Sequence, residues 1–262
     1  MLSFDGVTKR HGPRTVLTDV TFRALPGRVT AFLGPNGAGK SSALRILLGL
    51  DRASSGAALV NGLRYRDLRT PLRTVGALLD GSGAHGSRTA RAHLAWVARS
   101  NGIPGRRVAE VLERVGLAAA GRTRVRRFSL GMGQRLGLAA ALLGEPEVLV
   151  LDEPANGLDP AGVRWLRELL RGHADGGGTV LLSSHQIGEV AEVADDLAVI
   201  AGGRVVAHGP LGRLTAGHGS LEGAYFAWTG AADRGGAADL GGAQRPGGTG
   251  PLGGAGRSGS AR

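Results

Sequence analysis

Residues 34–41 read GPNGAGKS, a glycine-rich loop that ends in a lysine and a hydroxyl side chain. The loop follows an apolar run, RVTAFL (28–33), and precedes a helical pattern, SSALRILLGL (41–50). Glycines let a backbone wrap a compact anion, the amides at a helix N-terminus donate to its oxygens, and a lysine adds positive charge. The spacing predicts a triphosphate-binding loop, with Ser41 as a ligand of Mg²⁺. The residues predicted to bind the phosphates are Gly34, Pro35, Asn36, Gly37, Ala38, Gly39, Lys40, Ser41 and Ser42.

Further polar residues follow two apolar runs. EVLVLD (147–152) ends in Asp152 and precedes Glu153, and GTVLLSS (178–184) precedes His185. Parallel strands end at one edge of a sheet, so Asp152 is expected to reach Mg²⁺ and His185 the terminal phosphate. Glu153 points another way if strand alternation continues, and is expected to accept a proton from an attacking water. An acid pair that merely caps a turn is the alternative, and the phosphate loop upstream disfavours it.

A third stretch, RFSLGMGQRL (127–136), places two glycines at the start of an alanine- and leucine-rich helical pattern that runs to about Leu143. Glycine lowers helix stability, so this placement indicates a need other than the helix's own packing. Bare backbone N–H groups at a helix N-terminus suit an anionic ligand.

The elements that must position these residues alternate between strand and helix. The three apolar runs 28–33, 147–152 and 178–184 are each followed by a turn and a helical pattern, which predicts an α/β fold with a mainly parallel core sheet. LSFDGVTKR and TVLTDVTFRA, near the beginning, predict a smaller antiparallel sheet. Residues from about 87 to 145 show only helical patterns, so a helical subdomain is expected there.

Composition narrows the class of protein. The 262 residues contain no cysteine, which excludes a disulfide framework and fits a cytoplasmic location. No apolar stretch reaches the roughly 20 residues that a membrane-spanning helix needs, and no secretory signal is visible. The net charge of +11 comes from scattered arginines without an aromatic platform, so no nucleic-acid partner is expected. Residues 231–262 are rich in glycine and predict a disordered tail after a folded domain of residues 1–230.

Taken together, the motifs resemble those of the ATP-binding subunit of ABC transporters. They occur in the family's order: residues 34–41 as Walker A, FSLGM (128–132) as the signature, Asp152 with Glu153 as Walker B, GLD (157–159) as the D-loop and His185 as the H-loop. The sequences FSLGMGQRLGLA and LDEPANGLDP are most similar to those of export cassettes of the bacitracin and daunorubicin type. The resemblance covers about residues 1–230.

This resemblance implies a site shared between two chains. In the family, two cassettes pack head to tail, and the signature helix of one faces the ATP held by the other. Ser129, Gly131 and Met132 would therefore contact a nucleotide on a second cassette, either an identical copy or a paralogue, and Asp159 would lie at the same interface. The catalytic residues implied are Glu153, His185 and Lys40.

Three positions depart from the family's pattern. Asp80 stands where a glutamine usually contacts Mg²⁺, and would ligate the metal as a carboxylate. His11 stands where a tyrosine often stacks on adenine, and Leu130 replaces the first glycine of the signature.

The implied function is an ATPase that powers a separate transmembrane permease, an exporter of drugs, peptide antibiotics or similar compounds, from the inner face of the cell membrane. The alternative is a soluble ABC ATPase that acts on ribosomes or DNA. Ribosomal members carry two cassettes in one chain and DNA-repair members carry long coiled coils, whereas this sequence has one cassette and no heptad run.

Overall fold

The computed structural model describes residues 1–79, 81 and 83–236. Its main sheet has six strands in the order β5-β6-β7-β3-β8-β9, and the first five of these run parallel. The last strand, β9, pairs antiparallel with β8. This sheet confirms the predicted α/β class. Its strands are β5 (Val75–Leu78), β6 (Val148–Asp152), β7 (Thr179–Ser184), β3 (Arg28–Leu33), β8 (Asp196–Ala201) and β9 (Arg204–Pro210).

The central strands β3, β6 and β7 form where the sequence predicts strands. Every residue of β6 and β7 is buried, because helices cover one face of the sheet while a helix and the antiparallel sheet cover the other. Leu33 is paired with Ser184, and Asp152 with Ser183, so the three strands end side by side. Their carboxyl ends therefore bring the predicted site residues to one edge.

The predicted antiparallel sheet is also present, in the order β2-β1-β4. Phe4 stacks on Phe22 at 4.4 Å between ring centroids, and Phe22 lies 5.0 Å from Phe32 of β3, so aromatic contacts join the two sheets. The helix α1 packs its apolar side into the same core. The elements are β1 (Leu2–His11), β2 (Arg14–Ala24), β4 (Ser55–Val60) and α1 (Lys40–Leu47).

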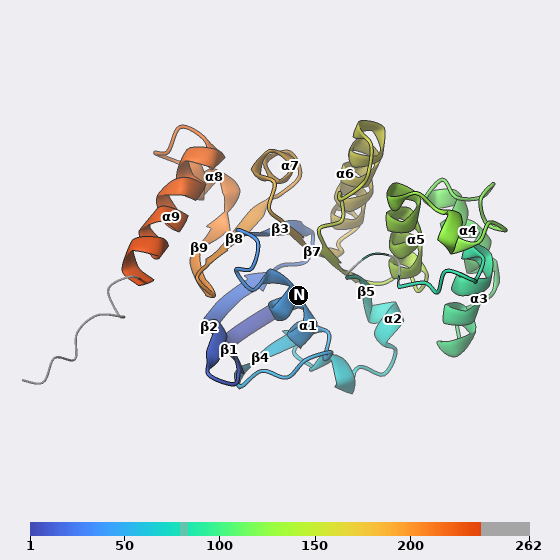
Figure 1. The fold of residues 1–262 in the computed structure, drawn as a ribbon, viewed down its shortest axis with the longest axis horizontal. Coiled ribbons are helices and arrows are strands. Elements are labelled where there is room, and N and C mark those ends of the chain that lie inside the picture. The colour runs from blue at the N-terminus through green and yellow to red at the C-terminus, as the bar shows by residue number, and fades with distance from the viewer. Residues whose placement is uncertain (80, 82, 237–262) are drawn as a thin grey trace, which may run out of the picture.

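Helices make up the region between β5 and β6. Leu94, Val111, Leu112 and Leu136 are fully buried and join three of these helices to the core of the main sheet. Figure 1 shows this group at one end of the molecule, away from the antiparallel sheet. The elements of this connection and the two short ones before β5 are η1 (Tyr65–Asp67), α2 (Pro71–Thr74), α3 (Ala90–Ser100), α4 (Arg106–Arg114), η2 (Val125–Arg127) and α5 (Leu130–Leu142).

The remaining helices follow β6, β7 and β9, and α8 and α9 lie at the opposite end from α3 and α4 (Figure 1). The helix α9 continues to Gly236, past the predicted domain boundary at residue 230. The rest of the predicted tail, residues 237–262, lies outside the described residues. The bounds are α6 (Pro160–Asp175), α7 (Ile187–Ala191), α8 (Leu211–Thr215) and α9 (Leu221–Gly236).

Candidate functional site

The loop between β3 and α1 has the backbone that its glycines predict. Gly37 and Gly39 have φ of 80° and 109°, conformations that side-chain-bearing residues rarely adopt. A Cβ on Gly34 would lie only 2.4 Å from the carbonyl oxygen of Ile200, on the neighbouring strand β8. Only glycine therefore fits at these positions, and the loop can curl closely over the end of the sheet.

Lys40 is the first residue of α1 and is only 6% exposed. Its Nζ donates to the carbonyl oxygen of Gly34 at 2.7 Å and lies 3.6 Å from Oε1 of Glu153. The ammonium group is thus held inside the loop by backbone and carboxylate oxygens. A phosphate placed in the loop would meet this charge at short range.

The loop borders a concavity of about 210 Å³. Asn36, Ser41 and Ser42 bring polar side chains to it, and Glu153 reaches it from the end of β6. Val16 of β2 supplies an apolar wall that the sequence did not predict. The full lining is Val16, Asn36, Gly37, Gly39, Lys40, Ser41, Ser42 and Glu153.

Asp152 ends β6 and is 8% exposed. The hydroxyl of Ser183, on β7, donates to its Oδ1 and accepts from the backbone N–H of Glu153 at 3.0 Å. Ser183 was not predicted as a site residue, although it stands in the strand end that the sequence singles out. Its hydroxyl fixes the orientation of the Asp152 carboxylate beside the phosphate loop.

Glu153 has φ of 48°, a left-handed conformation, directly after the strand. This left-handed turn, rather than the expected strand alternation, sets the direction of the side chain. Its Oε2 lies 2.8 Å from Nδ1 of His185, while its Oε1 faces Lys40. The structure therefore brings the three predicted catalytic residues, Glu153, His185 and Lys40, together around one carboxylate.

Gln134 of α5 supports this turn from behind. The side chain is 6% exposed, and its Nε2 donates to the carbonyl oxygen of Glu153 at 3.1 Å. Sequence reasoning missed this role. The available signal was a polar residue at a buried position of an otherwise apolar helix, which needs a hydrogen-bond partner.

The signature residues lie at the start of α5. Ser129 caps α5 by accepting from the backbone N–H of Met132 at 3.2 Å, and Leu130 is 73% exposed. A Cβ on Gly131 would lie 2.6 Å from the carbonyl oxygen of Gly157, so α5 begins against the D-loop. Asp159 of this loop caps α6 through Gly162. Ser129, Gly131, Met132 and Asp159 do not line the concavity of their own chain.

His11 remains apart from this group. It is exposed at the end of β1 and does not line the concavity. Asp80 lies outside the described residues.

The comparisons with known proteins agree with this geometry. The chain matches the family described as ABC transporter over residues 17–156. It is 36% identical over 206 residues to the lantibiotic transport ATP-binding protein SrtF of Streptococcus pyogenes, covering 79% of this chain and 89% of that protein. It is 38% identical over 220 residues to the daunorubicin resistance ATP-binding protein DrrA3 of Streptomyces coeruleorubidus, covering 82% and 70% of the two chains.

Solved structures show the same fold. One described as the ATP binding subunit of an ABC transporter has a TM-score of 0.80 at 28% identity, covering 87% of this chain and 99% of that one. A dimeric cassette, MJ0796, has a TM-score of 0.73 at 22% identity, covering 80% and 99%. Among the described residues, no helix is both long and apolar enough to span a membrane. The chain therefore belongs to the ABC transporter family, as one of its ATP-binding and ATP-hydrolysing subunits.

Proposed function

We propose that the concavity beside the phosphate loop binds Mg-ATP and that Glu153 is the base for its hydrolysis. The observation that carries this proposal is the position of the Glu153 carboxylate, between Lys40 Nζ at 3.6 Å and His185 Nδ1 at 2.8 Å, at the wall of the concavity. A triphosphate in the loop would present its terminal phosphate to Lys40. Glu153 and His185 would then face the side from which water attacks.

Each of these residues has its own role in the hydrolysis of ATP. The oxygen of a water molecule attacks the terminal phosphorus, and the bond to the bridging oxygen breaks, so that ADP leaves with the electron pair. Glu153 accepts the proton that the water loses, and His185 holds the Glu153 carboxylate in place. Lys40 balances negative charge on the phosphates during the step.

The donors at the site fit Mg²⁺ held chiefly by the nucleotide. Ser41 offers a hydroxyl and Asp152 a carboxylate, both oxygen ligands of the kind that Mg²⁺ prefers. Among the described residues, no group of three or more His, Asp or Glu side chains could hold a metal ion. A cation with one or two protein ligands takes its remaining ligands from phosphates and water, and it neutralises phosphate charge when bound.

The transport role rests on the relatives. This chain aligns with most of the length of proteins named for lantibiotic transport and daunorubicin resistance. We therefore propose that it powers a separate permease that exports such compounds. It would act at the inner face of the membrane. The relatives do not favour the alternative of a soluble ATPase on ribosomes or DNA.

The test is Glu153→Gln, which keeps the size of the side chain and removes its basicity. We expect ATP binding within threefold of wild type and at least a hundredfold slower hydrolysis, since a general base contributes about 10²–10⁴-fold. Fluorescent-nucleotide titration and phosphate release measure the two quantities.

Lys40→Ala is the companion variant and should lose Mg-ATP binding itself. Wild-type hydrolysis by Glu153→Gln would remove Glu153 as the base, and tight Mg-ATP binding by Lys40→Ala would refute the assignment of the phosphate loop.

A further inference from the structure

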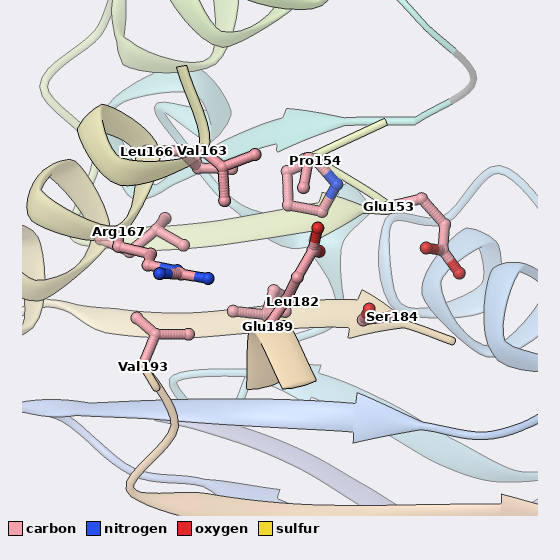
Figure 2. Close-up of a pocket in the computed structure, with 11 residues that line it drawn as sticks. Glu153, Pro154, Val163, Leu166, Arg167, Leu182, Ser184, Glu189 and Val193 are labelled. Carbon is pink, nitrogen blue, oxygen red and sulfur yellow. The ribbon is translucent and has the colours of Figure 1, made fainter. Parts of the chain in front are cut away.

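Behind the Glu153 turn lies a small, partly open cavity of about 30 Å³, which is room for one water molecule. Figure 2 shows the side chains of Arg167 and Glu189 directed into it, with Pro154 and Ser184 at its sides and the Glu153 carboxylate pointing away from it. Leu166, Leu182 and Val193 give it apolar walls. Glu153 lines both this cavity and the concavity beside the phosphate loop, and the two share no other lining residue.

The Arg167 side chain leaves a polar group unsatisfied at this place. Its Nε is buried without a hydrogen-bond partner, although its Nη1 pairs with Glu192 at the surface. A buried N–H without a partner is rare in native proteins because it loses the hydrogen bond that water would give it. The Arg167 side chain, which lines the cavity, therefore has an unused donor.

Glu189 supplies the matching acceptor. Its side chain lines the cavity opposite Arg167, and among the described residues the two form no direct ion pair. Burial raises the pKa of Glu189, Arg167 lowers it, Glu153 raises it and His185 lowers it. The carboxylate thus sits half-buried among charges with one donor near it and space between them.

The cavity joins three catalytic segments. Pro154 belongs to the turn that carries Glu153, Arg167 lies on α6 after the D-loop, and Glu189 lies on α7 directly after His185. A bridge across the cavity would tie α6 to α7. Since His185 contacts Glu153, that bridge would also fix the distance between these two residues.

We propose that one water molecule in this cavity accepts from Nε of Arg167 and donates to the carboxylate of Glu189, and that the two side chains thereby position Glu153 and His185 for hydrolysis. Both are positioning residues, because neither faces the nucleotide concavity. This inference rests on the proposed role of Glu153 as base.

Comparing Glu189→Ala with Glu189→Gln distinguishes a role of Glu189 as hydrogen-bond acceptor from a role of its negative charge alone. Alanine removes the acceptor, so kcat should fall about tenfold while KM for Mg-ATP stays within twofold. Glutamine keeps an oxygen that accepts from water, so its kcat should stay within threefold of wild type. Glu192→Ala is the matched control, because it removes the surface partner of the same arginine, and its kcat should equal that of wild type.

Arg167→Met tests the bridge from its other side and should lower kcat as Glu189→Ala does, with KM unchanged. It also serves if Glu189→Ala does not fold. Thermal unfolding of each variant checks that the fold remains intact.

An undiminished kcat in either Glu189→Ala or Arg167→Met would overturn the inference, and so would a loss in Glu189→Gln as large as in Glu189→Ala. If Glu153→Gln is inactive while Glu189→Ala is fully active, only this inference fails. If Glu153→Gln hydrolyses ATP normally, the proposed base itself is wrong.

Discussion

A single residue, Glu153, combines the chemistry of the site with an unfavourable backbone. Its φ of 48° costs a side-chain-bearing residue energy that glycine does not lose. The turn keeps this conformation because Gln134 and Ser183 bond its backbone on both sides. The conformation directs the carboxylate toward Lys40 and His185, so the strain has a use in positioning.

We therefore expect Glu153→Gly to be more stable than Glu153→Ala by about 1 kcal/mol, since only glycine relieves the left-handed conformation. Both variants should be inactive. Urea denaturation with equal m-values would measure the difference in the free energy of unfolding. An alanine variant as stable as the glycine variant would show that the turn relaxes and stores no strain.

At the scale of elements, the sequence predicted what local patterns determine. The strands β3, β6 and β7 are runs of apolar residues buried on both faces, and their periodicity and flanking turns identify them. The buried apolar run of β8 was overlooked. The edge strand β9 and the strand β4 were not predicted either, because β9 is mostly half-exposed and β4 begins with Ser55 and Gly56. Their strand conformation depends on pairing with neighbours that a local pattern does not reveal.

The residues of the site also divide into those that the local sequence predicts and those that it does not. The phosphate loop, Asp152, Glu153 and His185 were predicted because each stands at a strand end. The support from Gln134 and the cavity at Arg167 depends on how α5, α6 and α7 pack, and residues far apart in the sequence meet there. Sequence spacing carries no such information.

The loop after α1 is tied to β1 by one ion pair. Lys9 is 8% exposed, and its Nζ donates to Asp51 Oδ1 at 2.5 Å and to the carbonyl oxygen of Arg52 at 2.8 Å. The hydrogen bond from Lys9 lowers the pKa of Asp51. A carboxyl whose pKa is lowered on folding stabilises the protein above its unfolded pKa, near 4, and this stability is lost as the pH falls through its folded value.

Asp51→Asn should accordingly reduce the free energy of unfolding at pH 7 by about 2 kcal/mol, because Lys9 loses its charged partner. The difference from wild type should begin to shrink below about pH 4, where the unfolded wild-type chain takes up a proton at Asp51, and should disappear as the pH falls through the lower folded pKa of Asp51. Denaturation at several pH values measures it. Asp67→Asn, in an ion pair with both side chains more than half exposed, is the control and should change little at any pH.

At the scale of the whole molecule, the residues expected to serve one nucleotide fall into two groups, one at the concavity and one at the exposed signature surface at the start of α5. The phosphate loop and Glu153 line the concavity, while Ser129 and Gly131 lie at the start of α5 and do not. A complete site would need the second surface from another chain. We propose a head-to-tail pair of cassettes on this ground.

Mixing two inactive variants tests this pairing. Ser129→Arg should block the signature surface, and Glu153→Gln the base, but a mixed pair keeps one intact site. Random pairing predicts recovery of about a quarter of wild-type hydrolysis on mixing. Turnover per chain should also rise with protein concentration. Turnover by Ser129→Arg alone at the wild-type rate, or no gain on mixing when mixed pairs are present, would refute a shared site.

The burial of both lysines has a practical consequence. Lys9 and Lys40 are the only lysines in the chain, and they are 8% and 6% exposed. A protease that cleaves only after lysine thus finds no accessible bond in the native fold, and its cutting rate reports transient opening. The rate of cleavage at Lys9 would report how often the antiparallel sheet opens. The rate of cleavage at Lys40 would report how often the phosphate loop opens. Bound nucleotide would slow the second cut far more than the first.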